Sequence, residues 1–405
     1  MKISRWTALA WIAISELFAL SLWFSASAIL PELTKVWNLN SSMQAWVTAS
    51  VQIGFITGAL SSSLFGIADR FNARKIFAVS ALTGAVVNGL LVWVDSAWLG
   101  ITLRFITGIS MAGVYPIAVK LLSQWFPTKR GVAIGILVAA LTLGSSLPHF
   151  IVLFLSSVHW QLVIATSSIL ALISTVIITW VLPDTPVASK KNPVSFKLLK
   201  KVVTNKPVML ANYGYFGHQW ELYAMWTWLP AFLAASLITY SPQINPLWSK
   251  LFSFLSIGVA GAFGCIIGGY CAEKIGKSNL TIIAMSISAL CSIIIGFTFG
   301  SSIWLTLIVS LIWGMTVVAD SAQFSAAVTD FSNADYVGTA LTFQMSIGFL
   351  ITVFSINLVP VIQAQIGWEW VFAILSIGPI LGIISMSHLK YYETSGKKEP
   401  YTLWF

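Results

Sequence analysis

Charged residues are scarce in this sequence. Only 9% of its 405 residues are charged, whereas 57% are hydrophobic and the mean hydropathy is +0.86. Because soluble domains carry roughly 25% charged residues, this composition excludes an ordinary soluble protein. The apolar runs have the length of helices that cross a hydrocarbon core of about 30 Å, and they lack the alternation of barrel strands. The sequence therefore predicts an all-α integral membrane protein.

Cysteine is also rare. The three cysteines, Cys265, Cys271 and Cys291, lie in apolar segments and have neither metal-binding nor redox spacing. The chain has no phosphate-binding glycine loop and no arrangement of a nucleophile beside a base. We therefore expect no enzymatic activity, no metal site and no cofactor.

Acidic residues are few, which leaves a net charge of +9. If the N-terminus is cytoplasmic, eighteen of the 22 Lys and Arg residues fall in cytoplasmic segments. Lys35 and Lys250 fall on the outer side, and Arg104 and Lys120 fall within the membrane. This bias follows the positive-inside rule, so the basic charge requires no nucleic-acid partner. We predict a multi-pass protein of a bacterial-type inner (plasma) membrane with both termini in the cytoplasm.

Twelve apolar spans can be placed along the chain. They cover residues 7–30, 44–68, 75–94, 97–125, 131–155, 161–182, 208–236, 250–272, 280–299, 303–328, 338–362 and 369–389. The one long polar interruption, rich in proline and lysine, separates six spans from six. We therefore predict an N-terminal six-helix bundle (1–183), a basic cytoplasmic linker (184–206) and a C-terminal six-helix bundle (207–405).

The two halves of the chain repeat each other. The segment Glu16-Leu17-Phe18-Ala19 in the first span matches Glu221-Leu222-Tyr223-Ala224 in the seventh at an offset of 205. The polar loops after the second and eighth spans also match, with Asp69 aligned to Glu273 at an offset of 204. Two matches at nearly the same offset predict a duplicated six-helix unit with both copies in the same orientation.

These loops resemble the cytoplasmic motif of the major facilitator superfamily of secondary transporters, Gly-x-x-x-Asp-(Arg/Lys)-x-Gly-(Arg/Lys). The second copy, residues 269–277, keeps this pattern with Glu in place of Asp, whereas the first has Phe65 and Asn72 in place of glycines. The segment 104–108, RFITG, is similar to the fourth-helix motif of the family. The resemblance implies conformational gating by a set of loop residues: Asp69, Arg70, Arg74, Gly269, Glu273, Lys274 and Gly276.

The resemblance also implies two pseudo-symmetric six-helix bundles that rock to expose a central site alternately to each side of the membrane. We expect a monomer in the lipid bilayer, with a small-molecule substrate and protons as its other partners. A secondary transporter coupled to protons by symport is therefore the leading hypothesis.

Buried acids are the candidates for proton coupling. An ionised side chain at the centre of the bilayer costs roughly 2.5–3.5 kcal/mol, so an ionisable residue within a span indicates a functional or structural role. Glu221 and His218 share a helix face, and we expect them to form the main coupling site. Glu16 is the repeat counterpart of Glu221, and Asp320 lies on a polar face with Gln323. The structural alternative makes Glu221 a hydrogen-bonding partner and pairs Asp320 with Lys120.

The only cations in the spans, Arg104 and Lys120, favour a small anionic or polar organic substrate. Alternatively, Arg104 pairs with Glu16 or another internal acid, and Lys120 extends to the membrane surface. Further candidates for substrate binding are the polar residues Tyr215, His149, Gln323 and Gln344 and the aromatic residues Trp23 and Trp228, with Trp226 and Trp313 as other stacking candidates. Packing in the core is the commoner use of a histidine or an aromatic ring in such positions.

Other functions stay open. The many Trp, Phe and Met residues are consistent with efflux of hydrophobic compounds or drugs by proton antiport, although Leu147-Pro148 lacks the Gly-Pro pair of the antiporter motif. Glu16, His218, Glu221 and Asp320 are ligand types that permit a divalent-metal path. Inorganic anion transport of the nitrate and nitrite type is a further alternative. A receptor or channel is not supported, because neither a signalling domain nor a filter-like loop is visible.

Overall fold

The fold is entirely helical in the part of the chain that the structure describes, which confirms the predicted class. The structure is a computed structural model, and it describes residues 3–65, 67, 71–126, 130–155, 159–183, 196–333 and 336–395. Within these ranges, eleven helices are long and apolar enough to cross a membrane. The predicted first span is divided by a turn and is not one of these eleven helices. Counted as the twelfth segment, it makes the structure consistent with a twelve-helix transporter fold.

The first half, residues 3–183, contains the segments of the first six predicted spans. These are α1 (Arg5–Leu20) with η1 (Ser27–Ile29) and α2 (Leu30–Val36); α3 (Ser41–Leu64); α5 (Ala73–Leu90) with η2 (Leu91–Trp93); α6 (Ala97–Met111) with α7 (Tyr115–Trp125); α8 (Arg130–Leu155); and α9 (Trp160–Val176) with η3 (Ile177–Val181).

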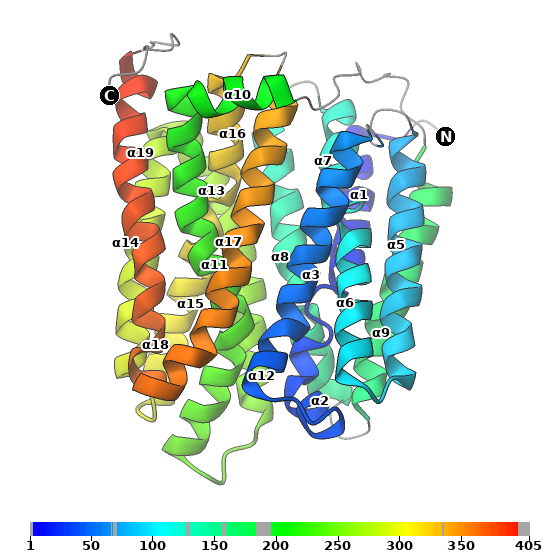
Figure 1. The fold of residues 1–405 in the computed structure, drawn as a ribbon, viewed down its shortest axis with the longest axis vertical. Helices are drawn as coiled ribbons and strands as arrows, with labels where there is room; N and C mark the ends of the chain where they lie inside the picture. The colour runs from blue at the N-terminus through cyan, green and yellow to red at the C-terminus, as the bar shows by residue number, and fades with distance from the viewer. Residues whose placement is uncertain are drawn as a thin grey trace.

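The second half, residues 196–395, begins with the short helix α10 (Phe196–Thr204). It continues with α11 (Lys206–Tyr240); α12 (Leu247–Ser253) with η4 (Phe254–Ala260) and α13 (Gly261–Ile275); α14 (Lys277–Phe297); α15 (Ile303–Ala319) with α16 (Ser321–Phe331); α17 (Val337–Ile366); and α18 (Trp368–Val371) with η5 (Phe372–Ser376) and α19 (Ile377–Ser395). The start of α1, the end of α19 and α10 lie at one end of the molecule, and α2, α12 and α18 lie at the other (Figure 1).

Asparagine side chains begin several of the long helices. Asn40, Asn72 and Asn205 precede α3, α5 and α11, and each side chain accepts a hydrogen bond from a backbone N–H of the first turn. Such N-caps satisfy donors that have no partner within the helix. Asn72 stands where the family motif has a glycine, and its side chain gives that position a clear structural use.

The repeat seen in the sequence also appears in helix packing. A Cβ atom on Gly108 of α6 would overlap the carbonyl oxygen of Val51 in α3. At the equivalent place in the second half, a Cβ on Gly314 of α15 would overlap the carbonyl oxygen of Ser256 in η4. Small residues let membrane helices approach closely, so both crossings depend on glycine.

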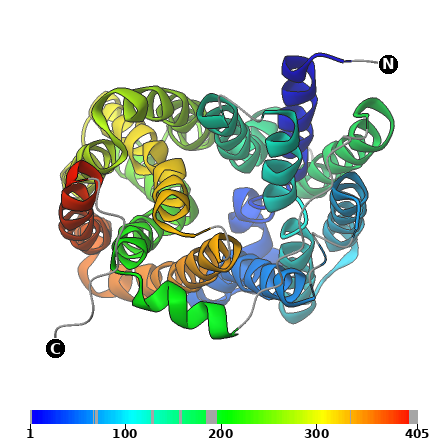
Figure 2. The same cartoon turned by 90° about the horizontal axis from the view of Figure 1, so that it is seen from above.

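The two halves lie on opposite sides of a central seam (Figure 2). Across this seam α3 packs against α17, and α8 packs against α13 and η4. The halves are also joined near each end of the molecule: Ser63 and Thr342 share a hydrogen bond of 3.4 Å, and Lys250 Nζ donates to the carbonyl of Ala28 at 2.5 Å. The conformation therefore has contacts between the halves on both sides of the centre.

Three predicted spans are interrupted close to the centre. The first span unwinds between Leu20 and Ser27, the fourth breaks before Tyr115, and the tenth breaks at Asp320. Tyr115 and Asp320 occupy matching places in the two halves, because they are separated by the same 205 residues that separate Glu16 from Glu221. Breaks in membrane helices are tolerated where protein or a cavity replaces lipid. They therefore mark the region where a transport site is expected.

Candidate transport site

A cavity of about 60 Å³ lies between the two halves. Its walls are mostly aromatic and aliphatic, with a few hydroxyl and amide groups, and they come from α1, α3, α7, α8, α11, α15, α16, α17 and the turn after α1. The lining residues are Leu20, Trp23, Phe55, Tyr115, Val138, Leu141, Ser145, Tyr215, Gln219, Leu222, Tyr223, Trp226, Val318, Ser321, Ser325, Met345 and Phe349. No lysine, arginine or acidic residue occurs among these described lining residues.

Aromatic rings from both halves meet at the cavity. The ring centroid of Trp23 lies 5.3 Å from that of Phe55 and 5.8 Å from those of Tyr223 and Phe349. The Trp226 ring lies 5.4 Å from Tyr223. These distances are typical of packed aromatic pairs. Trp23 and Tyr215, both predicted to bind substrate, are thus placed at the cavity, and so is Trp226.

Arg104 holds the unwound part of the first span. Its guanidinium donates to the carbonyl oxygens of Leu22, at 2.8 Å, and Trp23. It also contacts the side chains of Ser25, at 3.3 Å, and Asn88, at 3.1 Å. A turn inside the membrane leaves carbonyls without helical partners, and the five N–H groups of arginine can satisfy them. Arg104 thus fixes the backbone of Trp23 and is not among the described residues that line the cavity, and its predicted role in substrate binding stays a prediction.

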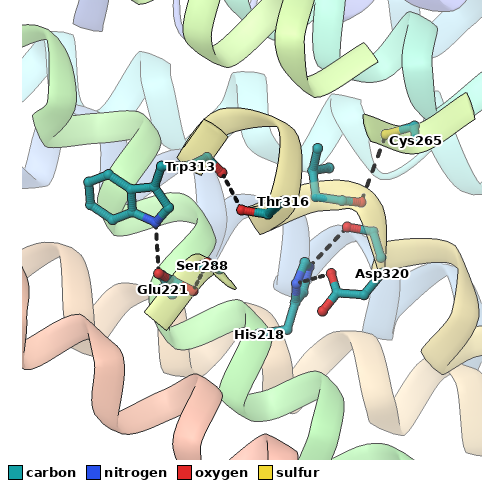
Figure 3. Close-up of polar contacts among 9 residues, drawn as sticks. His218, Glu221, Cys265, Ser288, Trp313, Thr316 and Asp320 are labelled. Carbon is teal, nitrogen blue, oxygen red and sulfur yellow. Dashed lines mark hydrogen bonds and ion pairs between the residues drawn. The ribbon is translucent and has the colours of Figure 1, made fainter. Parts of the chain in front are cut away.

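His218 of α11 lies beside the break in the tenth span. Its Nδ1 is 2.9 Å from Asp320 Oδ1, although the two atoms lack hydrogen-bond alignment, and its Nε2 is 3.0 Å from Ser321 Oγ. Figure 3 shows the imidazole directed toward Asp320. His218 and Asp320 are both about 1% exposed. Because Ser321 also lines the cavity, it connects the cavity to the His218 and Asp320 pair.

Glu221 has separate partners. One carboxylate oxygen accepts from Ser288 Oγ at 2.5 Å and the other from Trp313 Nε1 at 2.8 Å. In Figure 3 this carboxylate points toward α14 and α15, whereas His218 points toward Asp320. The two residues predicted to form the main coupling site therefore have separate partners, and their role in coupling stays a prediction. Residues three apart on a helix share a face, but the packing of neighbouring helices gives them different contacts.

Glu16, the repeat counterpart of Glu221, is fully buried. Neither of its carboxylate oxygens has a hydrogen-bond partner within the described ranges, so the predicted pairing with Arg104 does not occur. It lies within electrostatic range of Tyr115, which lines the cavity. The two repeat-related acids therefore occupy different polar surroundings.

The remaining predicted ligands are dispersed. Trp228 Nε1 donates to the carbonyl of Ile356 at 2.9 Å, and Gln344 Oε1 accepts from Ser325 at 2.9 Å. His149 is buried in α8, within electrostatic range of Lys250. The last two predicted residues, Gln323 and Lys120, are buried on α16 and half-buried on α7, respectively. None of the five appears in the described cavity lining.

The gating motif is described in part. Asp69 and Arg70 lie outside the described residues. Arg74 donates to the carbonyls of Ile178, at 3.2 Å, and Thr179, at 2.6 Å, which ties the start of α5 to the end of the sixth span.

In the second copy of the motif, Gly276 has a φ of 88°, a backbone conformation that favours glycine. The carboxylate of Glu393 accepts from the backbone N–H groups of Lys277 and Ser278, both at 3.1 Å. Lys274 Nζ lies 4.4 Å from the centre of the Tyr270 ring, Glu273 is exposed, and a Cβ on Gly269 would meet no atom within 4 Å. Each copy thus links the third helix of its half to the sixth, although the second copy does so through Glu393.

The sequence alone did not indicate several residues that line the cavity or bond the buried acids. Tyr115 and Gln219 line the cavity, and Ser288 bonds Glu221. Tyr115 could have been found from the repeat, because its counterpart is Asp320. Serine is too common in membrane helices to identify Ser288 by sequence alone. No group of three metal-ligating side chains occurs within the described ranges, so nothing there favours the divalent-metal path.

Two bundles of membrane helices around a central cavity, with interrupted helices beside it, define a membrane transporter. The chain belongs to the Major Facilitator Superfamily, whose family model matches residues 12–356. This confirms the family suggested by the loop motifs and a transport role that is not enzymatic.

Among curated relatives, the chain is similar to a candidate niacin/nicotinamide transporter, NiaP, of Bacillus subtilis (strain 168), with 26% identity over 377 residues and 88% of each chain covered. It is also similar to a gallate transporter of Pseudomonas putida, with 20% identity over 407 residues, covering 92% of this chain and 89% of that protein. Among solved structures, the human organic anion transporter MFSD10 matches with a TM-score of 0.73 and 14% identity, covering 95% of this chain and 100% of that one. At this identity the structural match shows the fold alone.

Proposed function

We propose that this protein moves a small organic anion, with an aromatic carboxylate as the favoured type, across a bacterial inner membrane by alternating access coupled to protons. The observation that carries the proposal is the connection from the central cavity through Ser321 to the His218 and Asp320 pair. A change of protonation at the pair can therefore alter the cavity lining through Ser321.

The size and chemistry of the cavity support a small substrate with a flat ring. A water needs about 10–15 Å³ of such space, so 60 Å³ holds only a few water-sized groups. This favours a small solute over the large amphipathic compounds of drug efflux. The aromatic walls offer stacking surfaces, and two similar proteins are named for niacin/nicotinamide and for gallate, of which niacin and gallate are aromatic acids. The proposal includes cytoplasmic termini, an inner-membrane location and a monomeric state. The charge bias supports the placement of the termini.

Proton coupling requires a buried acid or base that changes protonation as the cavity changes sides. A carboxyl group in apolar surroundings is harder to ionise, and a nearby cation makes ionisation easier. The buried side chains of Asp320 and His218 are in contact, and Glu221 provides a second buried carboxyl on the same helix as His218. We assign the coupling proton to the His218 and Asp320 pair, with Glu221 as the next candidate.

The test uses purified protein in proteoliposomes. Uptake of radiolabelled nicotinate and gallate is measured with and without an imposed pH gradient, with tartrate as a non-aromatic anion and a lipophilic dye as a drug-type compound. The proposal expects gradient-driven uptake of the aromatic acids, reduced in Asp320→Asn and His218→Gln. Uptake that ignores the gradient would remove the coupling claim, and transport of the dye alone would favour efflux of hydrophobic compounds instead.

A further inference from the structure

Two tryptophans in the cavity wall have indole N–H groups without a partner among the residues that the structure describes. Trp23 is 3% exposed and Trp226 is 1% exposed. Within the ranges the structure describes, the Nε1 atom of each is buried and makes no hydrogen bond. Leaving a buried donor unpaired is unfavourable, and a buried tryptophan usually finds an acceptor.

Several other buried or half-buried tryptophans in the described ranges do have acceptors. Trp37 donates to the carbonyl of Val94 at 2.7 Å, and Trp228 donates to that of Ile356 at 2.9 Å. Trp313 donates to Glu221, and Trp220, on the same helix as Trp226, donates to the carbonyl of Ile374 at 3.3 Å. Trp125 also lacks an acceptor within the described ranges, but it does not line the cavity. Among the tryptophans in the described ranges, only Trp23 and Trp226 therefore both line the cavity and have an unpaired indole N–H.

The two indoles come from opposite halves and share a neighbour. Trp23 lies in the turn after α1, where Arg104 binds its carbonyl, and Trp226 lies in α11. The ring of Tyr223 is 5.8 Å from Trp23 and 5.4 Å from Trp226, so it lies next to both. The two indoles thus flank one tyrosine ring at the cavity, one from each half.

We propose that the indole N–H groups of Trp23 and Trp226 bind the carboxylate of the substrate, one donor from each half, in place of a lysine or arginine. This inference rests on the proposed transport of an organic anion. A carboxylate presents two oxygens, so it can accept both bonds at once. Because the donors are neutral, they hold the anion without a buried ion pair, and the bridge between the halves forms only when the substrate is present.

The experiment measures equilibrium binding of radiolabelled nicotinate to the full-length protein in detergent. Trp23→Phe and Trp226→Phe keep a ring and remove the N–H, and Trp220→Phe is the matched control, since its N–H is satisfied outside the cavity. Loss of one bond to a charged acceptor is expected to raise the Kd for nicotinate about tenfold or more. Trp220→Phe is expected to change it by less than about twofold.

Nicotinamide separates recognition of the anion from packing of the ring. Its amide oxygen is a neutral acceptor, so the two variants are expected to weaken nicotinamide binding less than nicotinate binding. Equal losses for both ligands would mean that the rings act by packing, and would overturn the proposal. Wild-type levels of nicotinate binding in both variants would also overturn it.

A measurement on the unmutated protein covers the case in which a variant fails to fold. With ¹⁵N-labelled indoles, nicotinate is expected to shift two indole N–H resonances to the frequencies of hydrogen-bonded groups, and each shift disappears in one of the two Phe variants where that variant folds. Binding of nicotinate without any indole shift would overturn the proposal. If the wild type binds neither nicotinate nor gallate, the proposed substrate class fails and this inference fails with it.

Discussion

His218 Nδ1 lies 2.9 Å from Asp320 Oδ1, and this contact joins α11 to the break between α15 and α16. Two buried ionisable groups therefore meet at an interruption of the helix. Helix breaks leave backbone groups that can rearrange at low cost, so a change of charge at this point can be linked to movement of α16. The following predictions test this contact and the packing around it.

Neutralising Asp320 is expected to uncouple transport while leaving the cavity intact. In Asp320→Asn, the neighbour of His218 can no longer take up or release a proton, so uptake should lose most of its response to an imposed pH gradient. Counterflow exchange of labelled for unlabelled nicotinate needs no net proton movement and should persist. Glu16→Gln serves as the comparison, because Glu16 lies outside this contact. Equal gradient dependence in Asp320→Asn and wild type would place the coupling proton elsewhere.

The two repeat-related glutamates are expected to respond differently to amidation. Glu221 accepts bonds from Ser288 and Trp313, and Gln can accept only one of them while its NH₂ group faces the other donor. Glu221→Gln should therefore cost about 1–3 kcal/mol of stability. Glu16 has no hydrogen bond to lose in the described structure, so Glu16→Gln should lower stability less than Glu221→Gln does and should impair transport less. Thermal inactivation in detergent and initial uptake rates test both statements.

Removing the guanidinium of Arg104 is expected to destabilise the unwound turn of the first span. Arg104→Met leaves the carbonyl of Trp23 without its donor and that of Leu22 with the Ser25 hydroxyl alone, in a buried site, which should cost about 3 kcal/mol. The protein should lose activity at lower temperatures, and nicotinate binding should weaken because Trp23 loses its fixed position. Lys35→Met, at an exposed lysine of α2, is the control. Unchanged thermal inactivation in Arg104→Met would contradict this role.

The two equivalent helix crossings at Gly108 and Gly314 predict similar losses of stability when either glycine is replaced. Gly108→Ala and Gly314→Ala each place a methyl group against a backbone carbonyl, so each should destabilise the protein by about 1–3 kcal/mol. Gly269→Ala is a control on α13, because its Cβ would meet no atom within 4 Å. There alanine should be neutral or slightly stabilising, since it is the better helix former. A large loss in Gly269→Ala, or none in the other two, would contradict the packing described.

Lys250 is expected to hold the halves together at the end of the molecule where α2 and α12 lie. Its ammonium donates to the carbonyl of Ala28 at 2.5 Å, so Lys250→Met removes a polar link across the seam. Ser145→Cys, in a background without the three native cysteines, reports access to the cavity. A membrane-impermeant thiol reagent added from outside should label this cysteine several-fold faster in Lys250→Met. The reason is that the variant loses one hydrogen bond, worth about 1–2 kcal/mol, that keeps the cavity closed on this side. The same rate in both backgrounds would show that this link does not restrain opening.

Much of the architecture follows from local sequence. Long apolar runs fix the membrane class and the placement of helices, because only a helix satisfies its own backbone in lipid. The repeat of Glu16 and Glu221 at an offset of 205, and the loop motifs, identify the duplicated fold. Because charged residues are scarce, the few ionisable residues within the spans could be identified from the sequence. His218, Glu221 and Asp320 are all buried, as expected for such residues in a membrane span.

Only the tertiary structure decided which groups meet. His218 shares a helix face with Glu221, yet its neighbour is Asp320, about a hundred residues further along the chain. Arg104 satisfies backbone carbonyls that no sequence pattern marks as unpaired, because the unwinding of the first span is itself a consequence of packing. Likewise, Trp226 and Trp228 are two positions apart, but only Trp226 lines the cavity. Hydrophobicity is a local property that one segment carries alone, whereas the partner of a buried polar group depends on which helices cross and at what depth.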